Sequence, residues 1–373
     1  MWQAEVRVDL GAIRTNVAVL RSHAGAAEVM AVVKGDGYGH GMVPAARAAL
    51  AGGATWLGVC TLGEALQLRR AGIVAPVLAW LLAPGLPLAD AVVADVDLSA
   101  SSPGLLDEIT AAARTAGRPA RVHIKIDTGL SRGGATAADW PDLCDAAAKA
   151  VADGSIELVG VWSHFVHADV PEHATTDAQL AAFHDGLAVA ERYGLAPHYR
   201  HLANSAATLT RPDTHFDLVR PGIAIYGLSP VPRRDYGLRP AMTVRARVVL
   251  TKRVPAGQGV SYGHTYTTGR DTTLALVPVG YADGVPWAAG NSAPVRLAGA
   301  NRTIAGRVCM DQVVLDCGDD PVREGEVAVL FGPGDHGEPT ADDWARATST
   351  INYEIVTRMG SARVPRVYDG ADV

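Results

Sequence analysis

A single lysine stands between an apolar run and a glycine-rich segment near the start of the chain. Residues 28–33 predict a buried strand that ends at Lys34, and residues 35–41 read Gly-Asp-Gly-Tyr-Gly-His-Gly. Burial of an ammonium group disfavours its charged form and lowers its pKa. The neutral amine can then form a Schiff base. An arbitrary lysine is more often a solvated strand cap, but the tight glycine-rich segment favours Lys34 as a reactive amine.

Other polar residues follow the ends of later predicted strands. They are Arg132 after 121–126, His164 after 157–163, Asn204 and Ser205 after 199–203, and Arg220 and Gly222 after 216–219. The carboxyl ends of barrel strands meet at one rim, where chemistry is placed, and phosphate groups often bind after strands seven and eight. Ser205 could begin a helix there, Gly222 allows close approach of backbone amides, and Tyr38 could add a hydroxyl donor. Ordinary capping and turn roles remain the alternative for these residues.

An aldehyde cofactor that carries a phosphate fits this set of residues. Pyridoxal 5′-phosphate would be held as a Schiff base on Lys34, with Arg220 facing the pyridine nitrogen. Arginine only donates hydrogen bonds, so the ring nitrogen must accept and stay unprotonated. Such a ring is a weaker electron sink, which suits simple removal and return of a proton better than transamination.

Eight strand-like patterns alternate with helical patterns over about the first 230 residues. The strands are predicted at 28–33, 56–60, 77–82, 94–98, 121–126, 157–163, 199–203 and 216–219, and the helices at 10–20 behind an Asp9 N-cap, 41–50, 61–71, 102–117, 137–152 and 175–193. This alternation predicts a (β/α)8 barrel. A doubly wound open sheet is the alternative, although no Gly-x-Gly-x-x-Gly follows the first strand.

The pattern changes after Pro240. Short apolar runs at 244–249, 273–279, 294–298, 304–309, 313–316 and 326–331 are separated by Gly, Asn and Pro, and helical patterns lie near 340–349 and 352–358. These runs predict a mostly β second domain. We expect a barrel over 1–236 and a second domain over 237–373.

Composition excludes several classes of partner. The net charge of −6 gives no basic surface for nucleic acid, and no stretch approaches the roughly 18 apolar residues of a membrane span. The four cysteines are scattered, and the N-terminus has no apolar core of a signal peptide. We therefore expect a cytoplasmic protein without disulfides.

Several motifs together make the chain resemble the alanine racemase family across nearly its whole length. The matching segments are 31–41 around Lys34, 201–205 (His-Leu-Ala-Asn-Ser), 220–227 (Arg-Pro-Gly-Ile-Ala-Ile-Tyr-Gly), 260–263 (Val-Ser-Tyr-Gly), 280–284 (Gly-Tyr-Ala-Asp-Gly), 307–312 (Arg-Val-Cys-Met-Asp-Gln) and 351–354 (Ile-Asn-Tyr-Glu). The resemblance implies a pyridoxal-phosphate barrel, a C-terminal β domain, and a head-to-tail homodimer in which each active site is built from both protomers. It implies racemisation of alanine, with D-alanine supplied for the cell wall.

The resemblance also implies roles for individual residues. Lys34 is the cofactor lysine and the base on the D-alanine side, and Tyr262 of the partner chain is the base on the L-alanine side. Arg132 and the Met310 backbone hold the substrate carboxylate, and Tyr281 lines the access corridor. The remaining cofactor and catalytic positions are Tyr38, His164, Asn204, Ser205, Arg220, Gly222, Ile223, Asp311 and Tyr353. Lys125 matches a lysine that is carbamylated in some members and that positions the arginine at Arg132.

Racemisation requires a base on each face of the substrate, one protonated while the other is not. A tyrosine with an ordinary pKa of about 10 needs a stabilising neighbour to act in this way. We expect His164 to hydrogen-bond Tyr262, with cationic Arg132 nearby. Trp287 stands where many members carry an arginine, so substrate access is where this chain departs from the pattern.

Three other functions stay open at this point: a racemase of wider specificity that accepts serine, a non-catalytic pyridoxal-phosphate-binding protein, and a decarboxylase. The second domain with Tyr262 speaks against the binding protein, and Arg220 stands where a decarboxylase needs an acidic group. A metal site at His164, His167, His173 and Asp169 is not expected, because no His-Glu-x-x-His motif is present.

Overall fold

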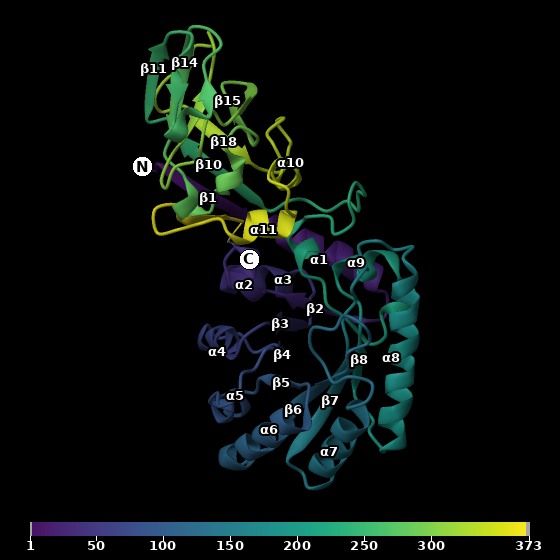
Figure 1. Cartoon of the computed structure of the whole chain (residues 1–373). Coiled ribbons are helices and arrows are strands. Elements are labelled where there is room, and N and C mark those ends of the chain that lie inside the picture. Colours follow the sequence, from purple (N-terminus) through teal and green to yellow (C-terminus); the bar gives the residue numbers. More distant parts are fainter. Residues whose placement is uncertain (1, 371–373) are drawn as a thin grey trace. The chain divides into compact units, whose positions relative to one another are not determined.

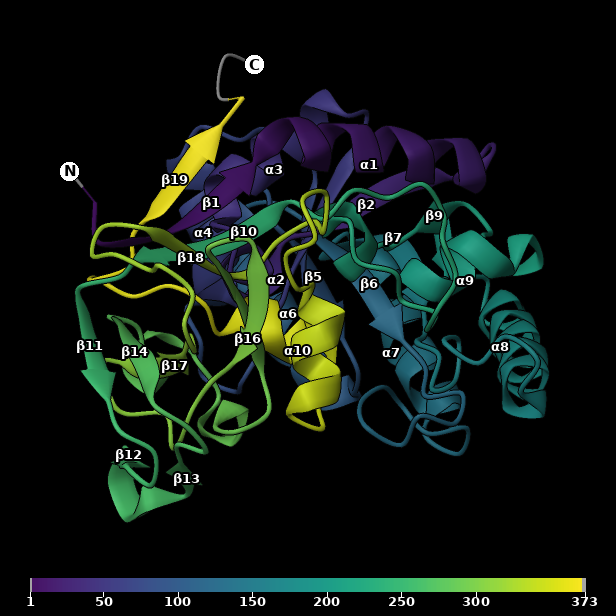
Figure 2. The same ribbon diagram turned by 90° about the horizontal axis from the view of Figure 1, so that it is seen from above.

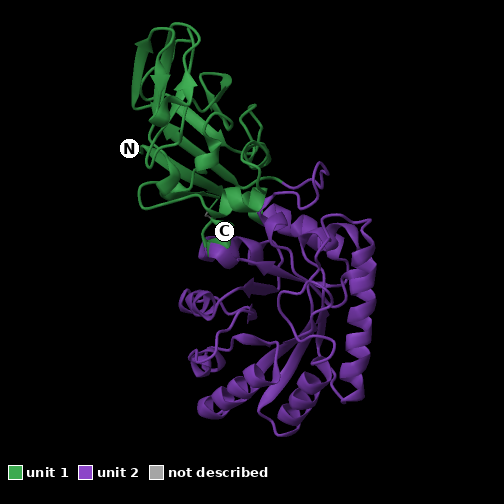
Figure 3. Cartoon of the chain, viewed as in Figure 1, with its two compact units in different colours: residues 1–13, 36–41, 239–373 green, residues 14–35, 42–238 purple. Residues whose placement is uncertain are grey.

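The computed structural model describes residues 2–370, which divide into two compact units (Figures 1 and 3). Unit 1 contains residues 1–13, 36–41 and 239–373, and unit 2 contains residues 14–35 and 42–238. The chain therefore crosses between the units after residues 13, 35, 41 and 238. A single boundary near residue 236 does not describe the first three of these crossings. The division into 1–236 and 237–373 stays a prediction.

Unit 2 contains an eight-stranded parallel sheet in the order β8-β7-β6-β5-β4-β3-β2-β9. Its strands are β2 (Glu28–Val32), β3 (Trp56–Val59), β4 (Val77–Ala79), β5 (Asp97–Ala100), β6 (Ala120–Lys125), β7 (Ile156–Trp162), β8 (Tyr199–His201) and β9 (Leu218–Val219). Backbone hydrogen bonds join the two ends of this sheet: Asp217 N–H donates to Arg200 O at 3.1 Å, and Arg220 N–H donates to Ala203 O at 2.9 Å. The predicted (β/α)8 barrel is confirmed.

Helices cover the outside of the barrel strands (Figure 1). The helices from the N-terminus to the end of unit 2 are α1 (Leu10–Ala24), α2 (Lys34–Tyr38), α3 (Met42–Ala51), α4 (Leu62–Arg70), α5 (Leu88–Val93), α6 (Pro103–Ala116), α7 (Trp140–Ala152), α8 (Ala174–Arg192) and α9 (Ser205–Thr210). Local sequence sets their ends. For example, Thr61 and Glu64 form a capping box at the start of α4, and Gly117, with a left-handed φ of 67°, ends α6.

The barrel interior is packed with side chains. Met30, Trp56, Leu78, Val159 and Leu218 form a buried cluster contributed by five different strands. Filling by inward-pointing side chains is what an eight-stranded barrel allows. The chemistry must therefore lie at the rim or among the few polar groups that share this interior.

Unit 1 is mostly β, as the sequence predicts. A six-stranded sheet has the order β16-β15-β18-β10-β1-β19, and smaller sheets have the orders β11-β14-β17 and β12-β13. Its elements are β1 (Ala4–Asp9), β10 (Met242–Arg247), β11 (Leu250–Val254), β12 (Gly259–Val260), β13 (Tyr266–Thr267), β14 (Thr272–Val277), β15 (Pro294–Leu297), β16 (Ala300–Thr303), β17 (Val313–Asp316), β18 (Val327–Phe331), β19 (Arg366–Asp369), α10 (Ala341–Ala347) and α11 (Asn352–Thr357).

The N-terminal strand β1 was not predicted from the sequence. It lies between β10 and β19 (Figure 2), antiparallel to the first and parallel to the second. Ala4, Val6 and Val8 are buried in that sheet. The predicted N-cap at the end of β1 is confirmed, because Asp9 Oδ1 accepts a hydrogen bond from Ala12 N–H at 2.9 Å. No helix within residues 2–370 is both long and apolar enough to cross a membrane.

Candidate active site

Lys34 lies where β2 ends at the rim of the barrel, with its Nζ 5.6 Å from the centre of the Trp80 ring. Burial lowers the pKa of Lys34, and the nearby Arg132 cation lowers it further. The structure therefore provides the partly desolvated amine that the sequence predicts.

Lys34 leads into a left-handed turn rather than an irregular loop. Residues 35–38 have φ values of 64°, 51°, 63° and 50°. Each non-glycine residue in that conformation costs roughly 1–2 kcal/mol, so the glycines at 35 and 37 halve the cost of the turn. Two contacts of Arg366 within unit 1 hold the turn: its Nη1 lies 2.8 Å from Asp36 Oδ2, and its Nε–H donates to Gly39 O at 2.6 Å.

The predicted phosphate-binding residues come together after β8 and β9. Asn204 caps α9, since its Oδ1 accepts from Ala207 N–H at 3.1 Å, and Ser205 is the first residue of that helix. Ser205 Oγ accepts from Gly222 N–H at 2.8 Å and from Ala224 N–H at 3.4 Å. Both N–H groups thus donate to the Ser205 oxygen, and the Ser205 O–H is the donor that this cluster leaves for an anion.

Arg220 is buried, and its guanidinium contacts no carboxylate within residues 2–370. Its Nη2 donates to Ser163 O at 2.7 Å, to Leu202 O at 3.3 Å and to His164 Nδ1 at 3.3 Å, and its Nη1 donates to His201 Nδ1 at 3.1 Å. Burial lowers the pKa of Arg220. Among the described residues, these acceptors take both protons of Nη2 and one of Nη1, which leaves the Nε–H and one Nη1–H of Arg220 for a ligand.

His164 is neutral at physiological pH. Burial holds its pKa well below the ordinary value, and the cations of Arg220 and Arg132 lower it further. Its predicted partner Tyr262 belongs to unit 1, and the contact between the two residues stays a prediction.

Lys125 and Arg132 belong to the end of β6 and the loop after it. Burial, followed by the charges of Arg220 and Arg132, lowers the pKa of Lys125 to about 8. Its Nζ lies 4.4 Å from the centre of the Trp162 ring. Asp127 holds the exposed loop of Arg132, because its Oδ1 accepts the N–H groups of residues 129, 130 and 131.

Three loops of unit 1 carry Tyr262, Tyr281 and Met310. Ser261 Oγ donates to Arg307 O at 2.7 Å, Tyr281 N–H donates to the carbonyl of residue 309 at 3.0 Å, and the N–H of residue 282 donates to Met310 O at 2.9 Å. These bonds fasten the loops together while Tyr262 stays 70% exposed. The candidate second base thus lies in a loop whose neighbours are held by hydrogen bonds, while its own side chain is exposed to solvent.

The other candidates of unit 1 lie near these loops or near the turn after Lys34. Asp311 Oδ2 is 3.9 Å from Arg363 Nη1, and the Tyr353 and Tyr38 rings are 6.3 Å apart. Exposed Trp287 lies under the Arg307 guanidinium, 5.5 Å from the ring centre. The corridor role of Tyr281 and the effect of Trp287 stay predictions.

Sequence reasoning assigned no role to three buried polar residues of the barrel interior: Asp97, His123 and His201. Each is buried in a strand of the parallel sheet, β5, β6 and β8 respectively. A charged or imidazole side chain in such a strand was the available signal, because polar groups are buried only with partners.

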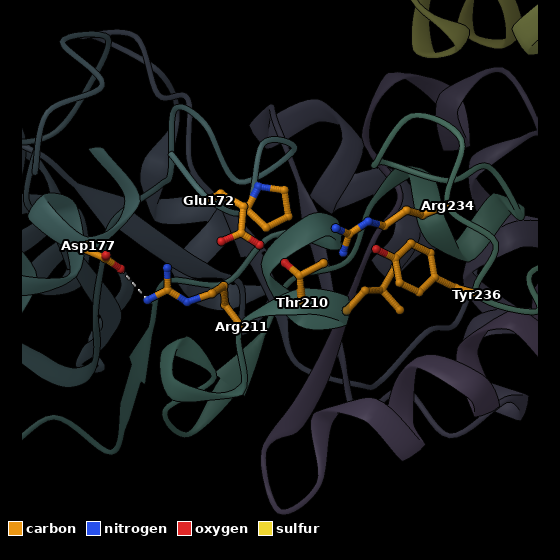
Figure 4. Close-up of a pocket in the computed structure, with 8 residues that line it drawn as sticks. Glu172, Asp177, Thr210, Arg211, Arg234 and Tyr236 are labelled. Carbon is orange, nitrogen blue, oxygen red and sulfur yellow. Dashed lines mark ion pairs between the residues drawn. The ribbon is translucent and has the colours of Figure 1, made fainter. Parts of the chain in front are cut away.

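A separate pocket of about 490 Å³ in unit 2 includes no predicted site residue (Figure 4). Glu172, Arg211 and Tyr236 are among its lining residues. Arg211 Nη2 pairs with Asp177 at 2.8 Å and with Asp213 at 2.7 Å, so its charge is already compensated. The histidines at 167 and 173 stack at 4.0 Å, and no group of three metal-ligating side chains occurs within residues 2–370.

Comparison with known proteins identifies both parts of the chain. The family profile "Alanine racemase, N-terminal domain" matches residues 8–230, and "Alanine racemase, C-terminal domain" matches residues 241–368. The chain is 74% identical to an alanine racemase of Salinispora arenicola, over 99% of both chains, and 62% identical to one of Thermobifida fusca, over 99% of this chain and 98% of the relative. A crystal structure of alanine racemase from D-cycloserine-producing Streptomyces lavendulae has a TM-score of 0.97 at 54% identity, covering 99% of this chain and 98% of that one.

Proposed function

Because the chain belongs to the alanine racemase family and interconverts L- and D-alanine, we propose that it does so with pyridoxal 5′-phosphate attached to Lys34 and with Lys34 and Tyr262 as its two bases. The observation that carries this proposal is the lowered pKa of the Lys34 amine at the barrel rim. That amine lies in the same unit as the donors of Ser205, Gly222 and Arg220.

The residues of unit 2 fit the cofactor. The O–H of Ser205 and the backbone at Gly222 and Ile223 would hold its phosphate, and the Nε–H of Arg220 would face the ring nitrogen. Asn204 supports this arrangement by capping α9. When bound, the cofactor withdraws electrons and so makes the Cα–H of alanine acidic.

The protein supplies the proton transfers. Lys34 Nζ takes the Cα proton of D-alanine and delivers one in the reverse direction, and its lowered pKa favours the neutral amine that this task requires. Tyr262 Oη performs the same task on the opposite face. Arg132 and the Met310 backbone hold the alanine carboxylate. Asp311 is a further catalytic residue of the site, and Tyr353 binds the phosphate of the cofactor.

We propose a head-to-tail homodimer in which Tyr262 acts in the partner's site. Its 70% exposure within one chain supports this, since a catalytic base needs a desolvated environment to hold a substrate. Large apolar side chains are also exposed on the same unit, namely Tyr281, Trp287, Met310 and Ile351. Exposed apolar groups of this kind favour a surface that another protein covers.

The decisive experiment has a chemical and a stereochemical part. Reduction of the purified protein with borohydride, followed by peptide mass spectrometry, should place the cofactor on Lys34. Chiral chromatography after incubation with L-alanine should show the racemic mixture. Attachment at another lysine would contradict the assignment, and a Lys149→Ala variant is the control because that exposed lysine pairs with Asp145.

Nothing in the site or in the relatives favours the serine racemase or the non-catalytic binding protein. We propose that the D-alanine serves cell-wall synthesis and that the enzyme acts in the cytoplasm, where its four free cysteines stay reduced. Incubation with L-serine beside L-alanine measures how strictly the site selects its substrate.

A further inference from the structure

A line of hydrogen-bonded groups runs from Arg220 through the barrel interior. Arg220 Nη1 lies 3.1 Å from His201 Nδ1, and His201 Nε2 lies 2.9 Å from His123 Nδ1. His123 Nε2 lies 3.1 Å from Asp97 Oδ2. All four side chains are at least 95% buried. We call these residues the Arg220 relay.

Arg220 at one end of the relay can only donate hydrogen bonds and the Asp97 carboxylate at the other end accepts them, and this determines which nitrogen of each histidine carries a proton. Arginine only donates, so His201 Nδ1 must accept, and neutral His201 carries its proton on Nε2. That proton is donated to His123 Nδ1, which places the His123 proton on Nε2, and Asp97 accepts it. Both rings are therefore neutral Nε2–H tautomers. Burial and the Arg220 cation hold the pKa of His201 well below the ordinary value, in agreement with this order.

The far end of the relay is anchored. Arg121 Nε donates to Asp97 Oδ1 at 2.8 Å and Arg121 Nη2 donates to Asp97 Oδ2 at 3.2 Å, and Arg121 Nη1 also pairs with partly exposed Glu157 at 3.2 Å. A buried cation without a counter-charge is costly. Because Arg121 is shared between Asp97 and Glu157, these two carboxylates together balance the cations of Arg121 and Arg220.

The barrel strand between the two histidines leaves room for their bond. His123 is on β6 and His201 on β8, with β7 between them, and the β7 residue paired with His123 is Gly160. A Cβ at Gly160 would lie 2.3 Å from His123 Nδ1, closer than any real contact. Trp162, the β7 residue paired with His201, stacks on that ring at 5.6 Å.

From this geometry we infer that Asp97 and His123, with Gly160 making the space, are positioning residues that act through His201 to aim the Arg220 guanidinium. The inference rests on the proposed function in one respect, namely that Arg220 faces the ring nitrogen of pyridoxal phosphate. The relay holds the guanidinium still, so its free N–H stays directed at that nitrogen during proton transfer.

The first test reads the positions of the protons directly. In the holoenzyme labelled with ¹⁵N-histidine, long-range ¹⁵N–¹H spectra report which ring nitrogen carries the proton. We expect His201 and His123, assigned by single replacements, to be neutral and protonated on Nε2 at pH 7. An imidazolium or an Nδ1–H tautomer at either position overturns the relay, whatever the enzyme's activity.

The second test breaks the relay with one methyl group. We expect Gly160→Ala to lower kcat for alanine by roughly 10–100-fold, by analogy with the loss of a hydrogen-bond partner that orients a metal ligand, with KM changed much less. The absorption band of the bound cofactor should shift, because Arg220 is no longer aimed. Asp97→Asn, which replaces one acceptor oxygen by a donor, should shift the band in the same direction.

Two controls separate positioning from general destabilisation. Gly104→Ala makes the same change on α6, where a Cβ meets no atom within 4 Å. Thr110→Val removes the hydrogen bond of buried Thr110 Oγ1 to Asp107 O at 2.8 Å on α6, a helix that carries no relay residue. Equal losses of kcat in Thr110→Val and Gly160→Ala, or an unshifted cofactor band in Gly160→Ala, would refute the positioning role. A wild-type protein that never takes up pyridoxal phosphate would refute the proposed function and the relay's role with it, whereas the tautomers alone decide whether the relay exists.

Discussion

Carbon dioxide is expected to add to Lys125 and form a carbamate. Only the neutral amine reacts: its nitrogen bonds to the carbon, one proton leaves to solvent, and the product carries one negative charge. At pH 7 an amine with the ordinary pKa of 10.5 is neutral in about 0.03% of molecules, whereas a pKa of about 8 leaves about 9% neutral. Burial and the neighbouring cations thus raise the reactive fraction about 300-fold.

The surrounding charges favour the product as well as the reaction. Arg220 and Arg132 both lower the pKa of Lys125, so a negative group in place of the ammonium relieves their mutual repulsion. The carbamate would accept hydrogen bonds from Arg132 and hold that exposed side chain in place for the alanine carboxylate. Loss of the carbamate should therefore raise KM for alanine more than it lowers kcat.

The assay is ¹³C NMR of the holoenzyme in ¹³C-bicarbonate. At constant carbon dioxide pressure, occupancy should rise with pH, most steeply below about pH 8, where the amine is still losing its proton. Lys125→Ala should remove the signal, and Lys149→Ala should keep it, because a hydrogen bond to Asp145 raises the pKa of that exposed lysine. A signal that survives in Lys125→Ala, or no signal from the wild type above pH 8, would show that the reasoning from burial is wrong.

Three further outcomes are expected. Tyr262→Phe should lower racemisation by at least about 100-fold, the usual contribution of a general acid–base group, while borohydride still fixes the cofactor to Lys34; polarimetry with peptide mapping checks both, and racemisation within threefold of wild type would remove Tyr262 as a base. Ser205→Ala should weaken the affinity of the apoprotein for pyridoxal phosphate about tenfold in fluorescence titrations, since one hydrogen bond of roughly 1.5 kcal/mol to a charged group is lost. The control Thr210→Val, which loses a hydroxyl bond to Ala206 O in the same helix, should bind the cofactor with unchanged affinity. Gly39→Ala should lower the melting temperature by several degrees, because the φ of Gly39 is 82° and a Cβ would lie 2.2 Å from Val356 O. Gly104→Ala, which has open space around it, should leave the melting temperature unchanged. Equal melting temperatures of the two variants in calorimetric scans would contradict the close approach at Gly39.

The barrel could be predicted because buried parallel strands read as continuous apolar runs. All eight predicted strands overlap observed ones, from β2 at 28–32 to β9 at 218–219. The short helices α5 and α9 have too few turns for a periodic pattern to show, although Ser205 was expected to begin a helix. The run at 304–309 was placed too late: β16 ends at Thr303, and Ile304 forms only an isolated bridge to Leu315.

The candidate site was predictable where position along a strand carries the information. Lys34, Lys125 and Arg220 lie at or just after strand ends, and that place can be read from the sequence. The partners of Arg220 could not be predicted, because which side of β6 or β8 faces the barrel interior depends on register and strand tilt. His123 and His201, 78 residues apart in sequence, meet only after the barrel closes.

The position of β1 has a consequence for how the protein is made. Its partners β10 and β19 begin at residues 242 and 366, so β1 leaves the ribosome more than 230 residues before its first partner and more than 350 before its second. At about 5–20 residues per second this delay is roughly ten seconds to a minute, during which Val6 and Val8 have no sheet to enter. Unit 1 is therefore completed only when β1 pairs with β10 and β19, after the barrel strands between them have been translated and have had time to pair.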